Sequence, residues 1–270
     1  EEVCRRTADM IVHWQRVGFV HGVMNTDNMS IAGETIDYGP CAFMDVYHPE
    51  TVYSSIDRTG RYAYGNQPRI AQWNLSVLAQ SLLPLLGEDE ERSVAEAQDA
   101  IDRFPGLYNA AYGTGLRAKL GLAREQSGDI ELAEDLLTRM AENRADFTLT
   151  FRRLCDVSAG DRETDAEIRQ LFEDPAAFDD WAARWRARLD RESIGDDERQ
   201  SAMRAVNPAL IPRNHLVVEV IDAATEAEDF APLEKLMTVL GNPYEDRPEY
   251  ARYARPPRPE QVVRETFCGT

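Results

Sequence analysis

Residues 21–39 read HGVMNTDNMSIAGETIDYG and bring several groups capable of chemistry into a short part of the chain. Asn28 and Asp37 each offer a hard oxygen of the kind that Mg²⁺ prefers alongside phosphates and water. They flank two short strand-like runs around a Gly-Glu pair, and this pattern predicts a hairpin that brings both oxygens to one ion. Asp27 places a second carboxylate in the same loop, where it can accept a proton from a hydroxyl group.

The same stretch follows most of the pattern of a protein-kinase catalytic loop. That pattern is a His, a metal-binding Asn seven residues later, and then Asp-x-Gly. His21, Asn28 and residues 37–39 fit it, and His21 is expected to hold the loop backbone. Val23 replaces the usual catalytic Asp and cannot accept a proton. A surface turn rich in Asn and Asp would explain Asp27 and Asn28 alone, but not the combined spacing.

The composition indicates a globular protein without a membrane span. Hydrophobic residues make up 43% of the 270 positions, which is enough for a sizeable core. No apolar run approaches the roughly 20 residues that cross a bilayer, and the opening residues lack the pattern of a signal peptide. The net charge of −18 argues against a broad surface for nucleic acid. We therefore expect a cytoplasmic monomer with no nucleic-acid or membrane partner.

The basic residues are almost all arginines. Arg accounts for 28 of the 30, and the two lysines are Lys119 and Lys235. This bias is typical of GC-rich or salt-adapted bacteria, so we expect a bacterial protein. A kinase-type fold needs a strand Lys on the phosphates, and neither lysine precedes the catalytic loop. The opening residues read as the middle of a helix, which also indicates an N-terminal part outside this chain.

The four cysteines are Cys4, Cys41, Cys155 and Cys268. They are widely spaced and form no C-x-x-C pair, so we expect no zinc site. Reduced thiols in a cytosolic protein are the simplest interpretation. Cys268 stands out because it lies close to the chain end, where a thiol is expected to be exposed and mobile.

Most of the remaining chain has the period of helices. Residues 40–66 lack any period and resemble an activation segment, and the acid-rich residues 158–167 predict a linker. The Pro-rich residues 241–270 predict an extended tail. Apolar residues at helical spacing predict helices over 5–19, 69–86, 88–103, 115–125, 128–144, 146–157, 178–192, 214–227 and 230–240.

Several motifs in sequence order resemble the selenoprotein O family, also called YdiU. These are protein adenylyltransferases with a protein-kinase-like fold. The resemblance begins with HGVMNTDNMSI at 21–31 and TIDYGP at 35–40. It continues through GRYAYGNQP at 60–68, QWNLSVLAQSLLPLL at 72–86, AKLGL at 118–122, DFTLTFRRL at 146–154, NPALIPRNHLVVEVI at 207–221 and NPYEDRPEYARYARPP at 242–257.

The resemblance implies a mainly α fold with a small β hairpin. Residues 1–157 would form a kinase-like C-lobe that carries the catalytic loop and activation segment. Residues 158–270 would form a helical C-terminal extension ending in the Pro-rich tail. The family's N-lobe, with its Gly-rich loop, strand Lys, partner Glu and phosphate-binding Arg residues, is absent from this chain. The chain alone is therefore expected to be inactive.

The resemblance also implies transfer of AMP from ATP to hydroxyl side chains of Ser, Thr or Tyr in protein substrates. The nucleotide is inverted relative to kinases, so the α-phosphate faces the acceptor. By the motif match, Asp27 is the proton acceptor, while Asn28 and Asp37 bind Mg²⁺, or Mn²⁺ in its place. Asp37 also touches the nucleotide phosphates through the metal. Such a transfer depends mainly on positioning and charge neutralisation.

Two other functions fit the same residues. One is a kinase-type phosphotransferase that uses Asp27 as its base, and the other is a pseudokinase that only binds a partner, as Val23 would suggest. Family members often end in a redox-active Cys, which Cys268 matches. In some members a Cys of the activation segment pairs with it. The corresponding residues 51–62 contain no Cys here, although Cys41 lies near.

Two further clusters have simple structural interpretations. Trp181 and Trp185 lie four residues apart, and this spacing predicts a packing stripe on one helix. Residues 213–215 read Arg-Asn-His after a proline. They fit either a contact with the active site or a cap of the following helix, and the cap is the favoured interpretation.

Overall fold

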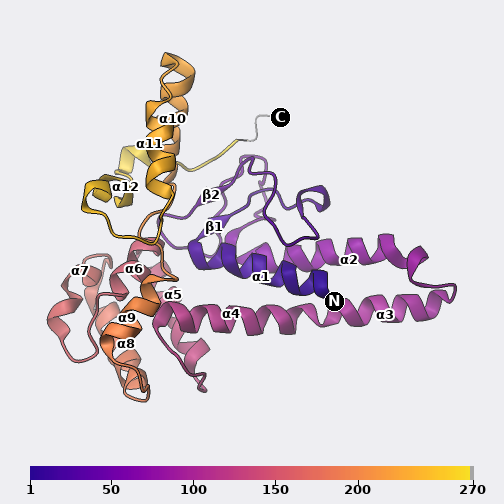
Figure 1. Cartoon of the computed structure of the whole chain (residues 1–270), viewed down its shortest axis with the longest axis horizontal. Helices are drawn as coiled ribbons and strands as arrows, with labels where there is room; N and C mark the ends of the chain where they lie inside the picture. Colours follow the sequence, from indigo (N-terminus) through magenta and orange to yellow (C-terminus); the bar gives the residue numbers. More distant parts are fainter. Residues whose placement is uncertain (268–270) are drawn as a thin grey trace. The chain divides into compact units, whose positions relative to one another are not determined.

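The computed structural model describes residues 1–267 and is mainly helical (Figure 1). Two short strands, β1 (Phe19–Val20) and β2 (Ala42–Phe43), form a two-stranded sheet. The helices are α1 (Glu2–Val17), α2 (Gln67–Leu86), α3 (Glu90–Asp102), α4 (Phe104–Leu120), α5 (Asp129–Glu142), α6 (Phe147–Leu154), α7 (Ala166–Arg169), α8 (Pro175–Leu189), α9 (Asp196–Arg204), α10 (Asn214–Ala227), α11 (Ala231–Leu240) and α12 (Ala251–Ala254).

The chain divides into two compact units. The first contains residues 1–42 and 49–115 together with residues 265–267. The second contains residues 43–48 and 116–264. The expected domain boundary at 157/158 does not coincide with this division, because it lies inside the second unit.

In the first unit, α1 buries an apolar face that includes Met10, Ile11 and Trp14, as its period predicts. The helix ends at Gly18, whose left-handed φ of 74° lets its N–H reach back to the last carbonyls of the helix. This turn leads the chain directly into β1 and the predicted catalytic loop at residues 21–28. The position of the loop therefore depends on the end of α1.

Helix α2 has apolar residues along most of its length, but only its first half is buried. Ile70, Ala71 and Leu75 are buried. Leu82, Leu85 and Leu86 in the second half are exposed, Leu85 by 79%. Helix α3 packs against α2 in the same unit, but it leaves this end of α2 uncovered within the described residues.

Helix α4 is much longer than the predicted segment 115–125. It starts at Phe104, and Pro105 occupies its first turn, where a missing N–H costs nothing. Three glycines within it weaken the helical signal of the sequence. One of them, Gly115, lies so close to α1 that an added Cβ would meet the Cδ of Arg16 at 2.9 Å. Close packing therefore explains a glycine that propensity alone would place outside a helix.

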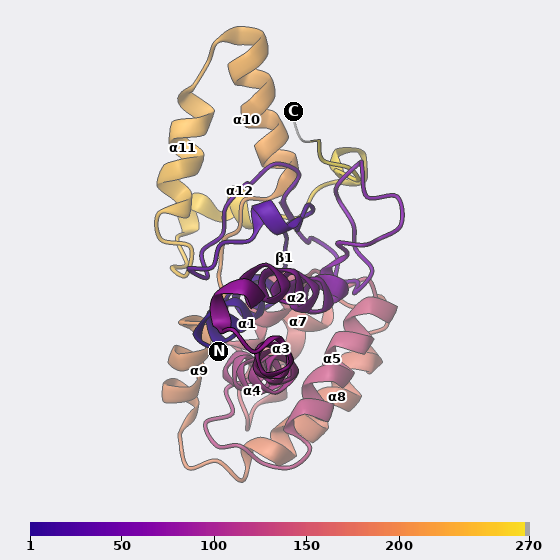
Figure 2. The same cartoon turned by 90° about the vertical axis from the view of Figure 1, so that its right-hand side faces the viewer.

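In the second unit, α5 and α8 lie side by side in both views (Figures 1 and 2). The predicted Trp stripe is confirmed: Trp181 and Trp185 are fully buried and stack with their ring centroids 5.7 Å apart. Each indole N–H donates to a backbone carbonyl, that of Leu132 for Trp181 and that of Leu120 for Trp185. Both polar groups are thus satisfied inside the core.

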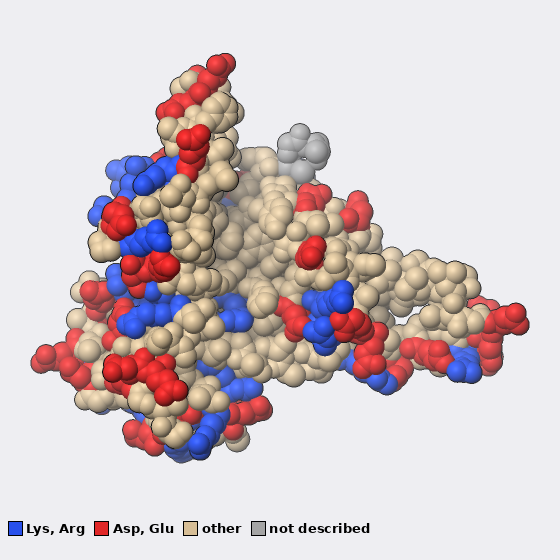
Figure 3. All heavy atoms as spheres, in the orientation of Figure 1, with Lys and Arg blue, Asp and Glu red and all other residues tan. Residues whose placement is uncertain are grey.

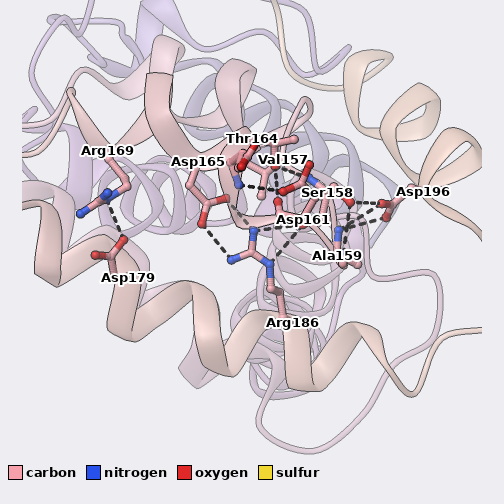
Figure 4. A network of polar contacts seen from close by, with 12 residues as sticks. Val157, Ser158, Ala159, Asp161, Thr164, Asp165, Arg169, Asp179, Arg186 and Asp196 are labelled. Atoms are coloured by element: carbon pink, nitrogen blue, oxygen red, sulfur yellow. Dashed lines mark hydrogen bonds and ion pairs between the residues drawn. The ribbon is translucent and has the colours of Figure 1, made fainter.

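The predicted linker at 158–167 is instead bound tightly into the second unit (Figure 4). The Ser158 hydroxyl donates to the Asp196 carboxylate at 2.7 Å. Arg186 bridges Asp165 at 2.6 Å and the Ser158 carbonyl at 3.0 Å, and its partner Asp165 is buried. Acidic residues here accept hydrogen bonds within the fold, so their abundance did not indicate a solvated linker.

The tail is less extended than predicted. It contains α12 and two short 3₁₀ turns, Pro248–Tyr250 and Pro259–Gln261. Helices α10 and α11, just before it, form an antiparallel hairpin (Figure 2).

No helix between residues 1 and 267 is both long and apolar enough to cross a membrane. In the view of Figure 3, acidic and basic atoms alternate over α7–α9, whereas acidic atoms gather around the connection between α2 and α3.

Candidate functional site

The hairpin predicted after the catalytic loop is present as a single antiparallel bridge between Met29 and Thr35. Asn28 directly precedes this bridge, and Asp37 follows it by two residues. The hairpin turns at Gly33, whose φ of 74° and close contact with Arg6 of α1 exclude a larger side chain. The two expected metal ligands are therefore held at the open end of one short hairpin.

His21 connects the two arms of the site. Its Nε2 donates to the Ile36 carbonyl at 2.9 Å, and its Nδ1 accepts from the Val23 N–H at 3.4 Å. This arrangement requires a neutral ring with the proton on Nε2. The side chain is fully buried, and burial lowers the pKa of His21. The expected role of His21 in holding the loop backbone is thus confirmed by its contacts.

Val23 and Asp27 face different environments. Val23 is 8% exposed and packs into the core of the first unit, whereas Asp27 is exposed in the 3₁₀ turn Thr26–Asn28. The Asn28 amide nitrogen donates to the Val23 carbonyl at 3.1 Å. This bond fixes the Asn28 side chain and leaves its oxygen as the atom available to a cation. The loop thus presents one carboxylate and one amide oxygen next to each other.

Three polar side chains that the sequence analysis did not select support the loop from behind. The Gln67 amide accepts from the His21 N–H at 3.0 Å and donates to the Phe19 carbonyl at 3.1 Å. Asn74 donates to the Met24 carbonyl at 3.0 Å, and the Tyr62 hydroxyl donates to the Asn25 side chain at 2.6 Å. For Gln67 and Asn74 the available signal was a polar residue at a position of α2 that the helical period assigns to the core, whereas Tyr62 precedes this helix.

The donor set suits Mg²⁺. Asn28 and Asp37 both supply oxygen, Asp37 is exposed, and Mg²⁺ usually takes one or two protein oxygens together with phosphates and water. Asp37 has a φ of 55°, a left-handed conformation that Asp tolerates better than most residues. Between residues 1 and 267, no group of three or more His, Cys, Asp or Glu side chains is arranged to hold a metal.

The interpretation of residues 213–215 as a helix cap is wrong. Arg213 occupies the N-cap of α10, but its side chain makes no capping bond. Its guanidinium instead binds Asp45 at 2.7 Å and Asp146 at 2.6 Å. Burial raises the pKa of Asp45, and the charge of Arg213 opposes this effect. Neither acid is among the predicted site residues, so the alternative interpretation, a contact with the active site, stays a prediction.

The last described residues contact the part of the first unit that follows the predicted hairpin. Thr266 forms a parallel bridge with Ser54, and its hydroxyl donates to the Pro40 carbonyl. The Cys41 thiol, partly buried, donates to the Tyr38 carbonyl at 3.3 Å. Cys4, Cys41 and Cys155 carry free thiols, whereas the predicted exposed thiol of Cys268 lies outside the described residues.

Comparison with known proteins gives consistent matches. A family model described as "Protein adenylyltransferase SelO" matches residues 1–241. A "Protein nucleotidyltransferase YdiU" of Rhodopseudomonas palustris (strain BisB18) is 58% identical over 270 residues, which cover 100% of this chain and 55% of that protein. A protein of the same name from Bradyrhizobium diazoefficiens is 59% identical over 268 residues, covering 99% and 54%.

A third protein with this name, from Methylorubrum extorquens, is 59% identical over 273 aligned residues. That match covers 99% of this chain and 55% of the relative. The chain therefore spans about half the length of the curated relatives it matches.

Proposed function

Because the chain belongs to the SelO family of protein adenylyltransferases, we propose that it forms the acceptor side of a site that transfers AMP from ATP to protein hydroxyl groups. The observation that carries the proposal is the pairing of a buried Val23 with an exposed Asp27. The usual kinase base is absent, and the loop offers its carboxylate four residues later. A base that is displaced relative to its position in kinases fits a reaction at a phosphorus atom that is displaced as well.

In the proposed reaction, the oxygen of a Ser, Thr or Tyr hydroxyl attacks the α-phosphorus of ATP. The bond from this phosphorus to the bridging oxygen breaks, and pyrophosphate leaves with its electron pair. Asp27 takes the hydroxyl proton, an effect worth about 10²–10⁴-fold in rate. Asn28 and Asp37 would hold Mg²⁺, which when bound neutralises the phosphate charge. His21 keeps the two arms that carry these ligands together.

The test uses ATP labelled at either the α- or the γ-phosphate and the full-length protein that contains this chain. Label on a protein acceptor from α-labelled ATP alone is expected. Transfer of the γ-label would instead support the kinase alternative, with Asp27 as its base. Absence of both transfers, with nucleotide still bound, would support the pseudokinase alternative.

The proposed metal site has its own test. Asp37→Ala removes one of the two expected ligands, so transfer should be lost and binding of ATP should no longer respond to Mg²⁺. Glu34→Ala, in the exposed turn of the same hairpin, is a matched control that should leave both unchanged. Full activity of Asp37→Ala at limiting Mg²⁺ would exclude this assignment.

A further inference from the structure

The hairpin of α10 and α11 packs on the rest of the second unit with one side. On that side Val239 is buried in an apolar cluster that includes Tyr250. The ammonium group of Lys235 lies over the Tyr250 ring, 4.6 Å from its centroid, and Glu219 pairs with Arg252. The packed side of the hairpin therefore has its partners within this unit.

The other side of the hairpin keeps large apolar side chains in solvent. Five of them are more than a third exposed: Val218, Ile221, Phe230, Leu233 and Met237. Val218 and Ile221 lie three residues apart on α10, and Leu233 and Met237 lie four apart on α11. This spacing places each pair in one stripe along its helix. Single exposed apolar residues are ordinary, but a group of them bordered by polar residues is typical of an interaction site.

The two stripes lie on the same face of the hairpin. Val220 of α10 and Leu236 of α11 line one cavity on the packed side. Ile221 and Met237 each come one residue later, which turns them about 100° round their helix axes. Because the two helices are antiparallel, this step moves both side chains toward the same side, away from the cavity. The stripes thus form one continuous apolar face.

Acidic residues border this face. Residues 216–240 contain one basic residue, Lys235, and six acids: Glu219, Asp222, Glu226, Glu228, Asp229 and Glu234. Asp222 and Glu234 adjoin the exposed apolar residues at helical spacing, and neither forms an ion pair within residues 1–267. Acidic atoms also gather at the tip of the hairpin in the view of Figure 3. The border of the face therefore attracts cations.

We propose that the face formed by Val218, Ile221, Leu233 and Met237 binds an amphipathic helix of a partner protein whose polar side is basic. A third helix laid along the hairpin would bury both stripes at once. Its lysines or arginines would meet the unpaired acids of the border.

The same charge argues against two other occupants. A second copy of this face would bring two acidic borders together, and the anionic surface of a membrane would repel them. The inference goes beyond the proposed reaction and does not depend on it.

The experiment uses the full-length protein that contains this chain and a fluorescent probe peptide of about five helical turns. The peptide has leucines along one side of its helix and lysines at all other positions. A second peptide has glutamate in place of every lysine. Fluorescence anisotropy gives the dissociation constant of each peptide at low and at high ionic strength. The lysine peptide should bind the wild-type protein, and the glutamate peptide should not.

Two variants test the apolar face. Ile221→Ser and Met237→Ser change side chains that are 53% and 66% exposed, so neither should disturb the fold. Each should raise the dissociation constant of the lysine peptide by about tenfold. Val262→Ser is the matched control, because Val262 is an exposed apolar residue of the same unit outside the hairpin. Its affinity should equal that of wild type.

One variant tests the acidic border. Asp222→Lys should raise the dissociation constant of the lysine peptide by about threefold at low ionic strength. Most of this difference should vanish at high ionic strength, where salt screens exposed charges. Glu134→Lys, at an exposed position of α5, changes the net charge by the same amount and should leave the affinity unchanged.

Three results would overturn the proposal. The first is no binding of the lysine peptide by the wild-type protein, or equal affinity in wild type, Ile221→Ser and Met237→Ser. The second is binding of the glutamate peptide as tight as that of the lysine peptide. The third is a dimer in sedimentation that Met237→Ser dissociates, because the face would then bind a second copy. Failure of AMP transfer would refute the proposed reaction and leave these binding results as they are.

Discussion

At the scale of single residues, the predicted catalytic loop has the buried Val23 where the kinase pattern has its catalytic Asp. One carboxylate of the loop, that of Asp27, is exposed to solvent. The sequence identified both Val23 and Asp27, because motif spacing assigns each to a definite position. The hydrophobic character of Val23 and the carboxylate four residues later also predict that Val23 packs inward and Asp27 faces outward. The structure confirms the burial of Val23, which is 8% exposed, and the exposure of Asp27.

Asp27→Asn separates basicity from shape. The amide keeps the size and hydrogen bonding of the carboxylate but cannot accept the proton of an acceptor hydroxyl. Transfer by the full-length protein should fall by about 10²–10⁴-fold, while the affinity for ATP should change little. The rate of AMP transfer and the dissociation constant of ATP are the quantities to compare.

Two further variants serve as controls for the predicted rate loss of Asp27→Asn. Glu34→Gln, an exposed carboxylate in the neighbouring turn, should transfer AMP at the wild-type rate. Val23→Asp restores an acid at the kinase position but should not produce transfer of the γ-phosphate. A wild-type rate in Asp27→Asn, or γ-phosphate transfer by Val23→Asp, would mean that the reacting phosphorus occupies the usual kinase position.

His21 makes stability depend on pH. Burial lowers its pKa in the folded protein, so below the ordinary value of about 6.5 the unfolded chain binds more protons. The contribution of neutral His21 is therefore complete above pH 6.5 and is lost as the pH falls below it, by up to about 1.4 kcal/mol per pH unit. Protonation also removes the acceptor of the Val23 N–H.

Urea unfolding of wild type, His21→Gln and His13→Gln at pH 7.5 and pH 5.5 measures this effect. Gln at position 21 can still donate to the Ile36 carbonyl but does not titrate. The loss of unfolding free energy on acidification should therefore be smaller in His21→Gln than in wild type. The exposed His13 is the control, and its variant should match wild type. An equal loss in all three proteins would contradict the assignment.

At the scale of elements, α2 supports the catalytic loop through polar residues in its buried face. Gln67 is fully buried and makes two hydrogen bonds to the loop backbone. Removing it leaves the buried His21 N–H without this acceptor, at about 1–3 kcal/mol for such a group. Gln67→Ala should lower the free energy of unfolding by at least the cost of one such group, about 1–3 kcal/mol. Gln80→Ala, at an exposed position of the same helix, should not lower it.

Denaturant unfolding gives the stability difference, and hydrogen exchange of the His21 amide reports the site directly. In Gln67→Ala that amide should exchange faster, because its acceptor is lost. An unchanged exchange rate would show that water or another group replaces the Gln67 oxygen without cost, and the supporting role of α2 would then be wrong.

Sequence reasoning worked where signals are local. The hairpin around Gly33 and the Trp stripe of α8 follow from spacing within a few residues. It failed where partners are distant: Gln67 is 46 residues from His21, and Asn214 is 171 residues from Phe43. It also failed where propensity and packing disagree, as in α4, whose Gly115 allows a close approach to α1. The acidic segment 158–167 was misread because its partners are also distant and come from α8 and α9.

At the scale of the whole molecule, the predicted site residues of this chain supply oxygens rather than cations for a polyphosphate. Asn28 and Asp37 are the proposed metal ligands, and Asp27 is the proposed proton acceptor. Neither lysine precedes the loop, and many arginines of the described residues pair with acids. Nucleotidyl transfer, however, needs positive groups aimed at the developing phosphate charge. The chain also spans only about half of its curated relatives.

We therefore predict that residues 1–270 alone transfer AMP negligibly, although they fold. Ligands on one side of the phosphates cannot replace the cationic groups that stabilise the other side. Transfer of α-label to a protein acceptor should be at background for this chain and robust for a full-length relative such as the Rhodopseudomonas palustris protein. Circular dichroism of the chain should show the high helix content of the structure, so that inactivity is not mistaken for unfolding. Robust transfer by the isolated chain would mean that its own arginines bind the phosphates. The proposal that the chain forms only the acceptor side of the site would then be wrong.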